Sequence, residues 1–120
     1  MIVWSIEAAL KSGCFDRVIV STDDDEIAEI ALKNGAEIPF MRPATLADDV
    51  TGTTPVIKQA VEWLVADGLR PSIVCCIYAT APFLSSGDLL KGLAQLDNTR
   101  SAYAFAVTSY AFPIQRAIKI

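Results

Sequence analysis

The sequence contains no histidine among its 120 residues. Zinc sites with histidine ligands, and mechanisms that use histidine as a general base or beside a nucleophile, are therefore excluded within this chain. The three cysteines, Cys14, Cys75 and Cys76, have neither the number nor the spacing of a disulfide framework or a zinc site. We expect them to be reduced and to serve as small core residues, with one of the adjacent pair buried.

Long apolar runs and basic residues are also scarce. No run approaches the ~20 residues of a membrane-spanning helix, and the N-terminus lacks the basic start and cleavage site of a signal peptide. The 10 Lys and Arg residues against 14 Asp and Glu give a formal net charge of −4. This balance argues against non-specific nucleic-acid binding, which needs a basic face. We therefore expect a cytoplasmic protein that binds neither nucleic acid nor membranes.

Helical and extended patterns alternate along a chain that is long enough for one small domain with its own core. Apolar stripes with helical period predict helices at residues 2–11 and 87–96, and one that is capped by Thr53 or Thr54 and runs to about residue 66. Asp23 or Asp24 can cap a further helix between the first two. Short apolar runs predict strands at residues 17–21, 36–40, 72–78, 101–109 and 115–120. The alternation indicates an α/β domain with a mainly parallel sheet flanked by helices.

Ligands of such sheets bind beyond the carboxyl ends of the strands. The loops at residues 21–25, 41–54 and 78–84 are therefore the candidate sites. The acidic side chains of the first loop could hold a divalent cation, but we favour capping of the next helix, because successive acids diverge around a helix start. No G-x-x-x-x-G-K or G-x-G-x-x-G motif occurs in the sequence, so no phosphate-binding loop can be named.

The other two loops carry side chains that could recognise a small molecule. Arg42 follows a predicted strand and Thr53 begins a predicted helix, so a guanidinium and a hydroxyl could meet the edge of a pyrimidine or a phosphate. A solvated arginine and an ordinary helix cap explain these two residues equally well. Tyr78 and Thr80 could offer hydroxyls to a polyol, or Tyr78 could belong to the core. The residues alone indicate an α/β domain with a small-molecule crevice.

Three stretches, taken in order, resemble the acylneuraminate cytidylyltransferases: residues 4–9 (WSIEAA), 18–23 (VIVSTD) and 42–49 (RPATLADD). Within that family, residues 77–84 (IYATAPFL) and 112–117 (FPIQRA) are most similar to the enzymes that act on pseudaminic acid. The resemblance covers nearly the whole chain. It implies a Rossmann-like fold of the nucleotide-diphospho-sugar transferase type.

The resemblance also implies a reaction, the metal-dependent transfer of CMP from CTP to a nonulosonic acid with release of pyrophosphate. The acceptor would be pseudaminic acid or a related sialic-type sugar. Arg42 and Thr53 match positions that contact the cytosine, and Tyr78 and Thr80 match the loop that meets the sugar. No residue of this sequence matches a catalytic position that we can name.

Gln115 and Arg116 lie in a stretch that resembles the part of the family that is near the sugar or phosphates. At its two ends, however, the chain departs from the family pattern. Family members begin with a strand and a triphosphate-wrapping loop that would precede Met1. Their metal-binding aspartates and dimerisation arm would follow Ile120, so we expect the ligands of Mg²⁺ outside this chain.

Residues 1–120 would then form a single partial cytidylyltransferase domain, and we expect the isolated chain to be inactive. Without the first strand, its neighbours would lack a hydrogen-bonding partner, so we expect a homo-oligomer or a rearrangement. The alternative function is a non-catalytic fragment or binding module that retains the fold, with weak or no binding of pyrimidine nucleotides. A nucleotidyltransferase for another sugar fits the segments around Tyr78 and Arg116 less well.

Overall fold

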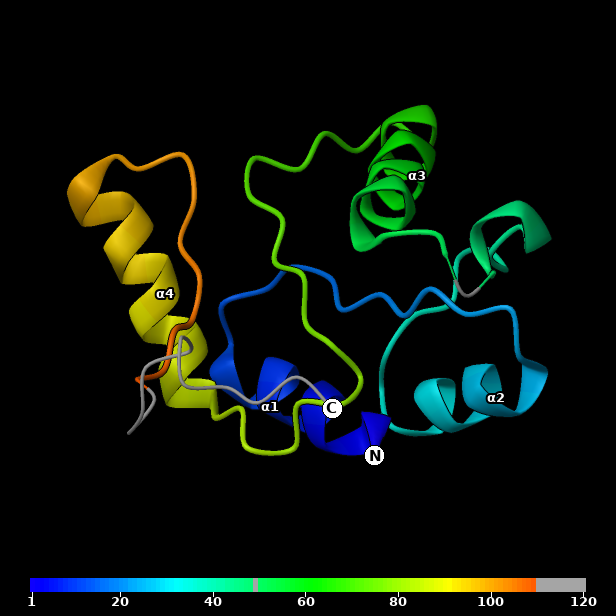
Figure 1. Cartoon of the computed structure of the whole chain (residues 1–120), viewed down its shortest axis with the longest axis horizontal. Coiled ribbons are helices and arrows are strands. Elements are labelled where there is room, and N and C mark those ends of the chain that lie inside the picture. Colours follow the sequence, from blue (N-terminus) through cyan, green and yellow to red (C-terminus); the bar gives the residue numbers. More distant parts are fainter. Residues whose placement is uncertain (49, 110–120) are drawn as a thin grey trace, which may run out of the picture.

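The computed structural model describes residues 1–48 and 50–109 of the chain. Its helical elements, in order, are α1 (Ile2–Ser12), α2 (Asp25–Lys33), the 3-10 turn η1 (Ala44–Leu46), α3 (Thr53–Ala66) and α4 (Ser86–Thr99). In Figure 1, α1 and α2 lie on one side of the extended segments that connect the helices, and α3 lies on the other. No helix within the described ranges has both the length and the apolar character needed to span a bilayer.

The helix predictions are confirmed with small changes at their ends. Helix α3 ends at Ala66 as predicted, but Thr53 is its first residue and not its cap. Helix α1 runs one residue further than predicted before Gly13 ends it with a φ of 64°. Glycine adopts this left-handed conformation readily, which explains the position of the stop. Helix α4 begins one residue earlier than predicted, because Ser85 and Asp88 form a reciprocal capping box at its start, and it ends three residues later, at Thr99.

Two predicted strands meet as extended segments in one parallel bridge, between Ile19 and Glu37. The N–H of Val20 donates to the carbonyl oxygen of Glu37 at 2.9 Å, and the N–H of Glu37 donates to that of Val18 at 2.8 Å. This is the only β pairing among the described residues, so the mainly parallel sheet is not formed in that part of the chain. The segments at residues 17–21 and 36–40 keep the parallel direction that was predicted.

Helix α1 forms the centre of the packed region. Its buried Ile6 packs with Ala31 and Ala36, and Val18, Val20 and Ile38 lie around this cluster. Its Ala8 and Ala9 pack with Leu89 of α4, next to Val18 and Ile77 from two different extended segments. The α1 helix therefore positions the segments that lead into two of the three candidate loops.

On the opposite side, α3 contacts the chain after the bridge through the rings of Phe40 and Trp63, whose centroids are 5.6 Å apart.

The remaining strand predictions differ from the structure. Residues 72–78 are extended but form no β bridge with another segment among the described residues, so this segment is not the central strand that the sequence predicts. Cys75 and Cys76 are both exposed, and the expectation that one is buried was wrong for the same reason. Residues 101–109 are exposed and form no strand. The predicted strand at residues 115–120 lies outside the described residues.

Candidate functional site

Arg42 is tied to the loop that follows the first extended segment. Its Nε–H donates to Ser21 Oγ at 3.1 Å, and its Nη2 donates to the carbonyl oxygen of Ser21. Its own main-chain N–H donates to the carbonyl oxygen of Thr22 at 2.8 Å. The two N–H groups of Nη1 make no hydrogen bond within residues 1–48 and 50–109. The guanidinium is therefore held along one edge and can donate from the other.

The acidic loop beside Arg42 is a helix cap, as we favoured. Asp24 is the N-cap residue of α2, and its Oδ1 accepts a hydrogen bond from the N–H of Ile27 at 2.9 Å. The buried hydroxyl of Thr22 accepts from the N–H of Asp24 at 3.1 Å. In the part of the chain that is described, no three Asp, Glu, Cys or His side chains gather closely enough to hold a metal ion. These bonds order the loop that carries Ser21.

Thr53 and Tyr78 lie side by side, with Thr53 Oγ1 and Tyr78 Oη 3.1 Å apart. The prediction that Thr53 or Thr54 caps α3 was wrong, because the N-cap position is Gly52 and no side chain of the described residues caps this helix. The Thr53 hydroxyl is therefore available to the phenol. Tyr78 is 63% exposed, so its alternative role as a core residue is also wrong. Two residues that are 25 positions apart in the sequence thus form one hydroxyl pair.

The turn that begins at Tyr78 carries Thr80, whose side chain is exposed. The N–H of Ala81 donates to the carbonyl oxygen of Tyr78 at 3.2 Å and closes the turn. The Ser5 hydroxyl donates to the same oxygen at 3.0 Å. Neither Ser5 nor Ser21 was predicted as a site residue. For Ser5, the available indication was a polar residue beside Ile6 on the apolar face of a predicted helix, which implies a buried hydrogen bond.

The loop between Arg42 and Thr53 is shaped by a carboxylate. Hydrogen bonds from the side chain and the N–H of Thr51, together with the N–H of Val50, hold the pKa of Asp48 below its ordinary value. An ionised carboxylate accepts such bonds more strongly than a neutral one, so the loop favours charged Asp48. No hydrogen bond among the described residues joins Arg42 to Thr53 or Tyr78. Gln115 and Arg116 lie outside the described residues, so their assignment stays a prediction.

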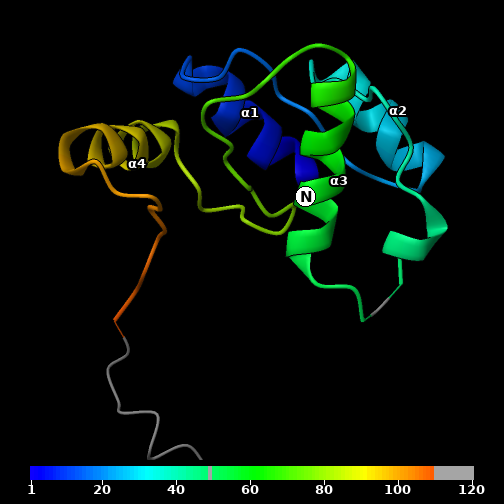
Figure 2. The same cartoon turned by 90° about the horizontal axis from the view of Figure 1, so that it is seen from above.

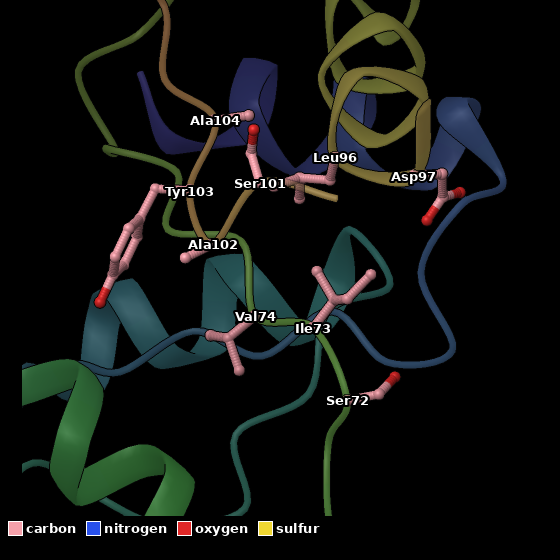
Figure 3. A pocket seen from close by; sticks show the side chains of 9 residues that line it. All are labelled: Ser72, Ile73, Val74, Leu96, Asp97, Ser101, Ala102, Tyr103 and Ala104. Carbon is pink, nitrogen blue, oxygen red and sulfur yellow. The ribbon is translucent and has the colours of Figure 1, made fainter. Parts of the chain in front are cut away.

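A hollow of about 560 Å³ lies at the other end of residues 72–78, against the end of α4 (Figure 3). Its lining consists of Ser72, Ile73, Val74, Leu96, Asp97, Ser101, Ala102, Tyr103 and Ala104. Among these described residues, Asp97 is the one charged group, so the hollow offers no cation to a phosphate. It is separate from the loops that carry Arg42, Thr53 and Tyr78, and we do not assign the nucleotide to it.

Comparison with known proteins agrees with the resemblance seen in the motifs. The pseudaminic acid cytidylyltransferase of Campylobacter jejuni subsp. jejuni serotype O:2 is 44% identical over 117 residues, which are 98% of this chain and 50% of the relative. The N-acylneuraminate cytidylyltransferase of Escherichia coli O18:K1:H7 is 39% identical over 108 residues, 90% of this chain and 24% of the relative. The chain thus spans half or less of the length of these relatives.

The family profile described as Cytidylyltransferase matches residues 1–115. The matched range includes the three loops and both pairs of residues that the structure brings together, Ser21 with Arg42 and Thr53 with Tyr78. A nucleotidyltransferase fold follows from this match, although the described residues form only one β bridge of it. By this match over nearly its whole length, the chain belongs to the cytidylyltransferase family.

Proposed function

We propose that this chain supplies the base-binding and sugar-binding loops for transfer of CMP from CTP to a nonulosonic acid, with release of pyrophosphate. The sugar would be pseudaminic acid or a related sialic-type acid. The observation that carries this proposal is 44% identity to a pseudaminic acid cytidylyltransferase across 98% of the chain. The arrangement of the candidate loops supports it.

Arg42 and Thr53 would recognise the cytosine. Cytosine presents acceptors at O2 and N3 and a donor at its amino group, whereas uracil carries a proton at N3. The Nη1 N–H groups of Arg42 can donate to acceptors, and the Thr53 hydroxyl can accept from the amino group. Since Ser21 holds the other edge of the guanidinium, Arg42 loses less side-chain freedom when the base binds. This combination favours CTP over UTP.

Tyr78 and Thr80 would contact the sugar, because both lie on one turn and both carry exposed hydroxyls. Each hydroxyl can donate and accept, which suits an acceptor that is rich in hydroxyl and amide groups. Gln115 and Arg116 would lie near the sugar carboxylate or the phosphates. A guanidinium matches either of these anions by bidentate hydrogen bonding.

The chemical step requires alignment and neutralisation of charge. The anomeric hydroxyl of the sugar forms a bond to the α-phosphorus, and the bond from that phosphorus to the pyrophosphate oxygen breaks. The family resemblance predicts Mg²⁺, which would neutralise the phosphates when bound. Its ligands stay a prediction from the resemblance, which implies that they lie outside this chain. What the described residues do is bind and orient the substrates.

The test of nucleotide recognition is the melting temperature of the chain with CTP, UTP or ATP, each with and without Mg²⁺. A ligand at 100 times its Kd stabilises the folded state by about 2.7 kcal/mol. We expect a shift with CTP that Arg42→Ala and Thr53→Ala remove. The matched controls are Arg70→Ala and Thr54→Ala, which change exposed residues of the same types and should keep the shift. No shift at millimolar nucleotide in the unaltered chain would overturn the nucleotide assignment.

The alternative, a non-catalytic binding module, predicts a different pair of results. CTP would stabilise the chain only weakly or not at all, and no pyrophosphate would be released when CTP and the sugar are both supplied. Pyrophosphate release by the chain alone would exclude this alternative and would also contradict our expectation that the isolated chain is inactive. A shift without release supports a chain that binds but needs further polypeptide for turnover.

We also propose that the mainly parallel sheet is completed by another strand, contributed by a second copy of the chain in a homo-oligomer. The support is the pair of extended segments at residues 18–21 and 73–77. The first is bonded on one side only, and the second has no main-chain partner among the described residues. Open strand edges of this kind recruit other strands. A solution mass equal to that of one chain at all concentrations would contradict the oligomer.

A further inference from the structure

Ser5 connects α1 to the candidate site across 73 positions of sequence. Its side chain is buried, with 5% of its surface exposed, and its hydroxyl donates to the carbonyl oxygen of Tyr78 at 3.0 Å. A helical serine commonly donates to a carbonyl one turn earlier in its own helix. Ser12 of the same helix does so, because its hydroxyl donates to the Ala9 oxygen at 2.6 Å. Ser5 instead uses its hydroxyl on a distant segment.

The oxygen that accepts the Ser5 hydrogen bond is the carbonyl oxygen of Tyr78, where the turn that we assign to the sugar begins. The N–H of Ala81 also donates to the Tyr78 oxygen, at 3.2 Å, so this oxygen accepts two hydrogen bonds. A carbonyl oxygen has two lone pairs, and both are engaged here. The peptide plane between Tyr78 and Ala79 is thereby held from two directions. That plane sets the course of the turn on which Thr80 lies.

The side chain of Tyr78 is held at its other end. Its phenol oxygen lies 3.1 Å from Thr53 Oγ1 at the start of α3. In Figures 1 and 2 the chain near Tyr78 passes beside the N-terminal half of α1, and α3 lies beyond the extended segments. Tyr78 thus spans from a helix on one side to a helix on the other. Its main chain is anchored by Ser5, and its hydroxyl meets Thr53.

We propose that Ser5 is a positioning residue, which holds the turn at residues 78–81 so that Tyr78 and Thr80 face the sugar acceptor. The consequence for the sugar rests on the proposed function, whereas the hold on the turn does not. Without the Ser5 hydroxyl, the Ala81 bond still satisfies the Tyr78 oxygen, so the chain stays folded and the turn gains freedom. Sugar binding would weaken, and CTP binding through Arg42 would not.

Two measurements without any ligand test the hold on the turn. In Ser5→Ala, exchange of the Ala81 amide should become roughly three- to tenfold faster, as expected for the loss of one hydrogen bond. The nuclear Overhauser effect between the Tyr78 ring and the Thr53 methyl group should weaken. Ser12→Ala is the matched control, since it removes a buried hydroxyl from the same helix and should change neither measurement.

Ser5→Thr keeps the hydroxyl and should restore both measurements. If Ser5→Ala does not fold, Ser5→Cys replaces it, because a thiol is a weaker donor and should give an intermediate exchange rate. Unchanged Ala81 exchange and an unchanged Tyr78–Thr53 effect in the folded variant would overturn the proposal. The same result in Ser12→Ala as in Ser5→Ala would also overturn it, because the change would then reflect general loosening of α1.

The functional part is tested with pseudaminic acid and N-acetylneuraminic acid as probes in the presence of CTP. We expect Ser5→Ala to raise the Kd of the bound sugar about three- to tenfold, in proportion to one lost hydrogen bond, and to leave the CTP-dependent melting shift unchanged. Equal weakening of CTP and sugar would overturn the specific role in sugar positioning. If the unaltered chain binds neither CTP nor sugar, the proposed function fails, while the exchange measurement still decides whether Ser5 holds the turn.

Discussion

The structure contains two extended segments of similar apolar character, at residues 18–21 and 73–77. They differ in whether their backbone pairs with another segment. Both contact α1, since Val18 and Ile77 pack against the same cluster of Ala8, Ala9 and Leu89. The first segment is paired through Ile19 with Glu37, whereas the second has no main-chain partner in the described ranges. Exposure follows pairing: Val18 and Val20 are half-buried, but Ile73 and Val74 are each 49% exposed.

The difference shows that an apolar run does not form a strand by itself. The first segment has a nearby partner because α2 returns the chain alongside it within 20 residues, and the Arg17 side chain bonds Glu37 on that partner. The second segment receives one side-chain anchor at its end, from Ser5 to the Tyr78 oxygen, but within the described ranges it forms no backbone hydrogen bond to another extended segment. Strand formation is a pairwise property, and it depends on what lies alongside.

Hydrogen exchange should show the largest contrast between the two segments. The amides of Val20 and Glu37 donate to carbonyls across the bridge, so they should exchange at least about 100-fold more slowly than those of Cys75 and Cys76. The measurement is amide exchange followed by NMR on dilute chain. Equal protection of all four amides at low concentration would mean that the second segment has a partner within the same chain. Protection of Cys75 and Cys76 that rises with concentration would indicate pairing between copies.

A matched pair of core substitutions should give the next largest effect. Ile6 is 2% exposed and packs from α1 against α2 and the bridged segments, so Ile6→Ala should cost about 2–5 kcal/mol of unfolding free energy. Ile73→Ala removes the same atoms from a half-exposed site and should cost less than about 1 kcal/mol. Urea unfolding of both variants measures the difference. Similar losses would show that residues 73–77 are packed as firmly as the bridged region.

Local patterns predicted the helices well, because their stops and caps lie within the helix or next to it. Gly13 ends α1 and Asp24 caps α2, and both residues are recognisable from the sequence. The order and direction of the bridged segments also followed from the alternation of patterns. The central strand at residues 72–78 did not form as predicted, because its backbone partner is not present among the described residues.

The contacts of the candidate site were not predicted, and its membership stays a prediction. Arg42, Thr53, Tyr78 and Thr80 were selected from loop position and family resemblance. The pairing of Thr53 with Tyr78 depends on Gly52 taking the cap position, which a choice between adjacent hydroxyl residues could not decide. The roles of Ser5 and Ser21 depend on long-range contacts to residues 78 and 42, and no local pattern encodes those distances.

The smallest effect should come from the ion pair that supports the bridge. Arg17 Nη2 lies 2.6 Å from Glu37 Oε2, and 24% of the Arg17 side chain and 46% of the Glu37 side chain are exposed, so solvent screens the attraction. At pH 7, Glu37→Gln should lower the melting temperature by on the order of a degree or two. Glu29→Gln is the matched control, because its carboxylate pairs with Lys33 at an exposed site and touches no bridge.

The pH dependence of this effect has a definite sign. Hydrogen bonds from Arg17 lower the pKa of Glu37 from its ordinary value of 4.5 in the folded chain. A carboxyl with a lowered folded pKa contributes stability that is fully present above the unfolded pKa and is lost as the pH falls through the folded pKa. The gap in melting temperature between the unaltered chain and Glu37→Gln should therefore be constant above about pH 5 and should close as the pH falls below 4.5. A gap that widens on acidification would show that Glu37 is not held in its charged form by Arg17, and that the first segment owes its order to the bridge and the packing of α1 alone.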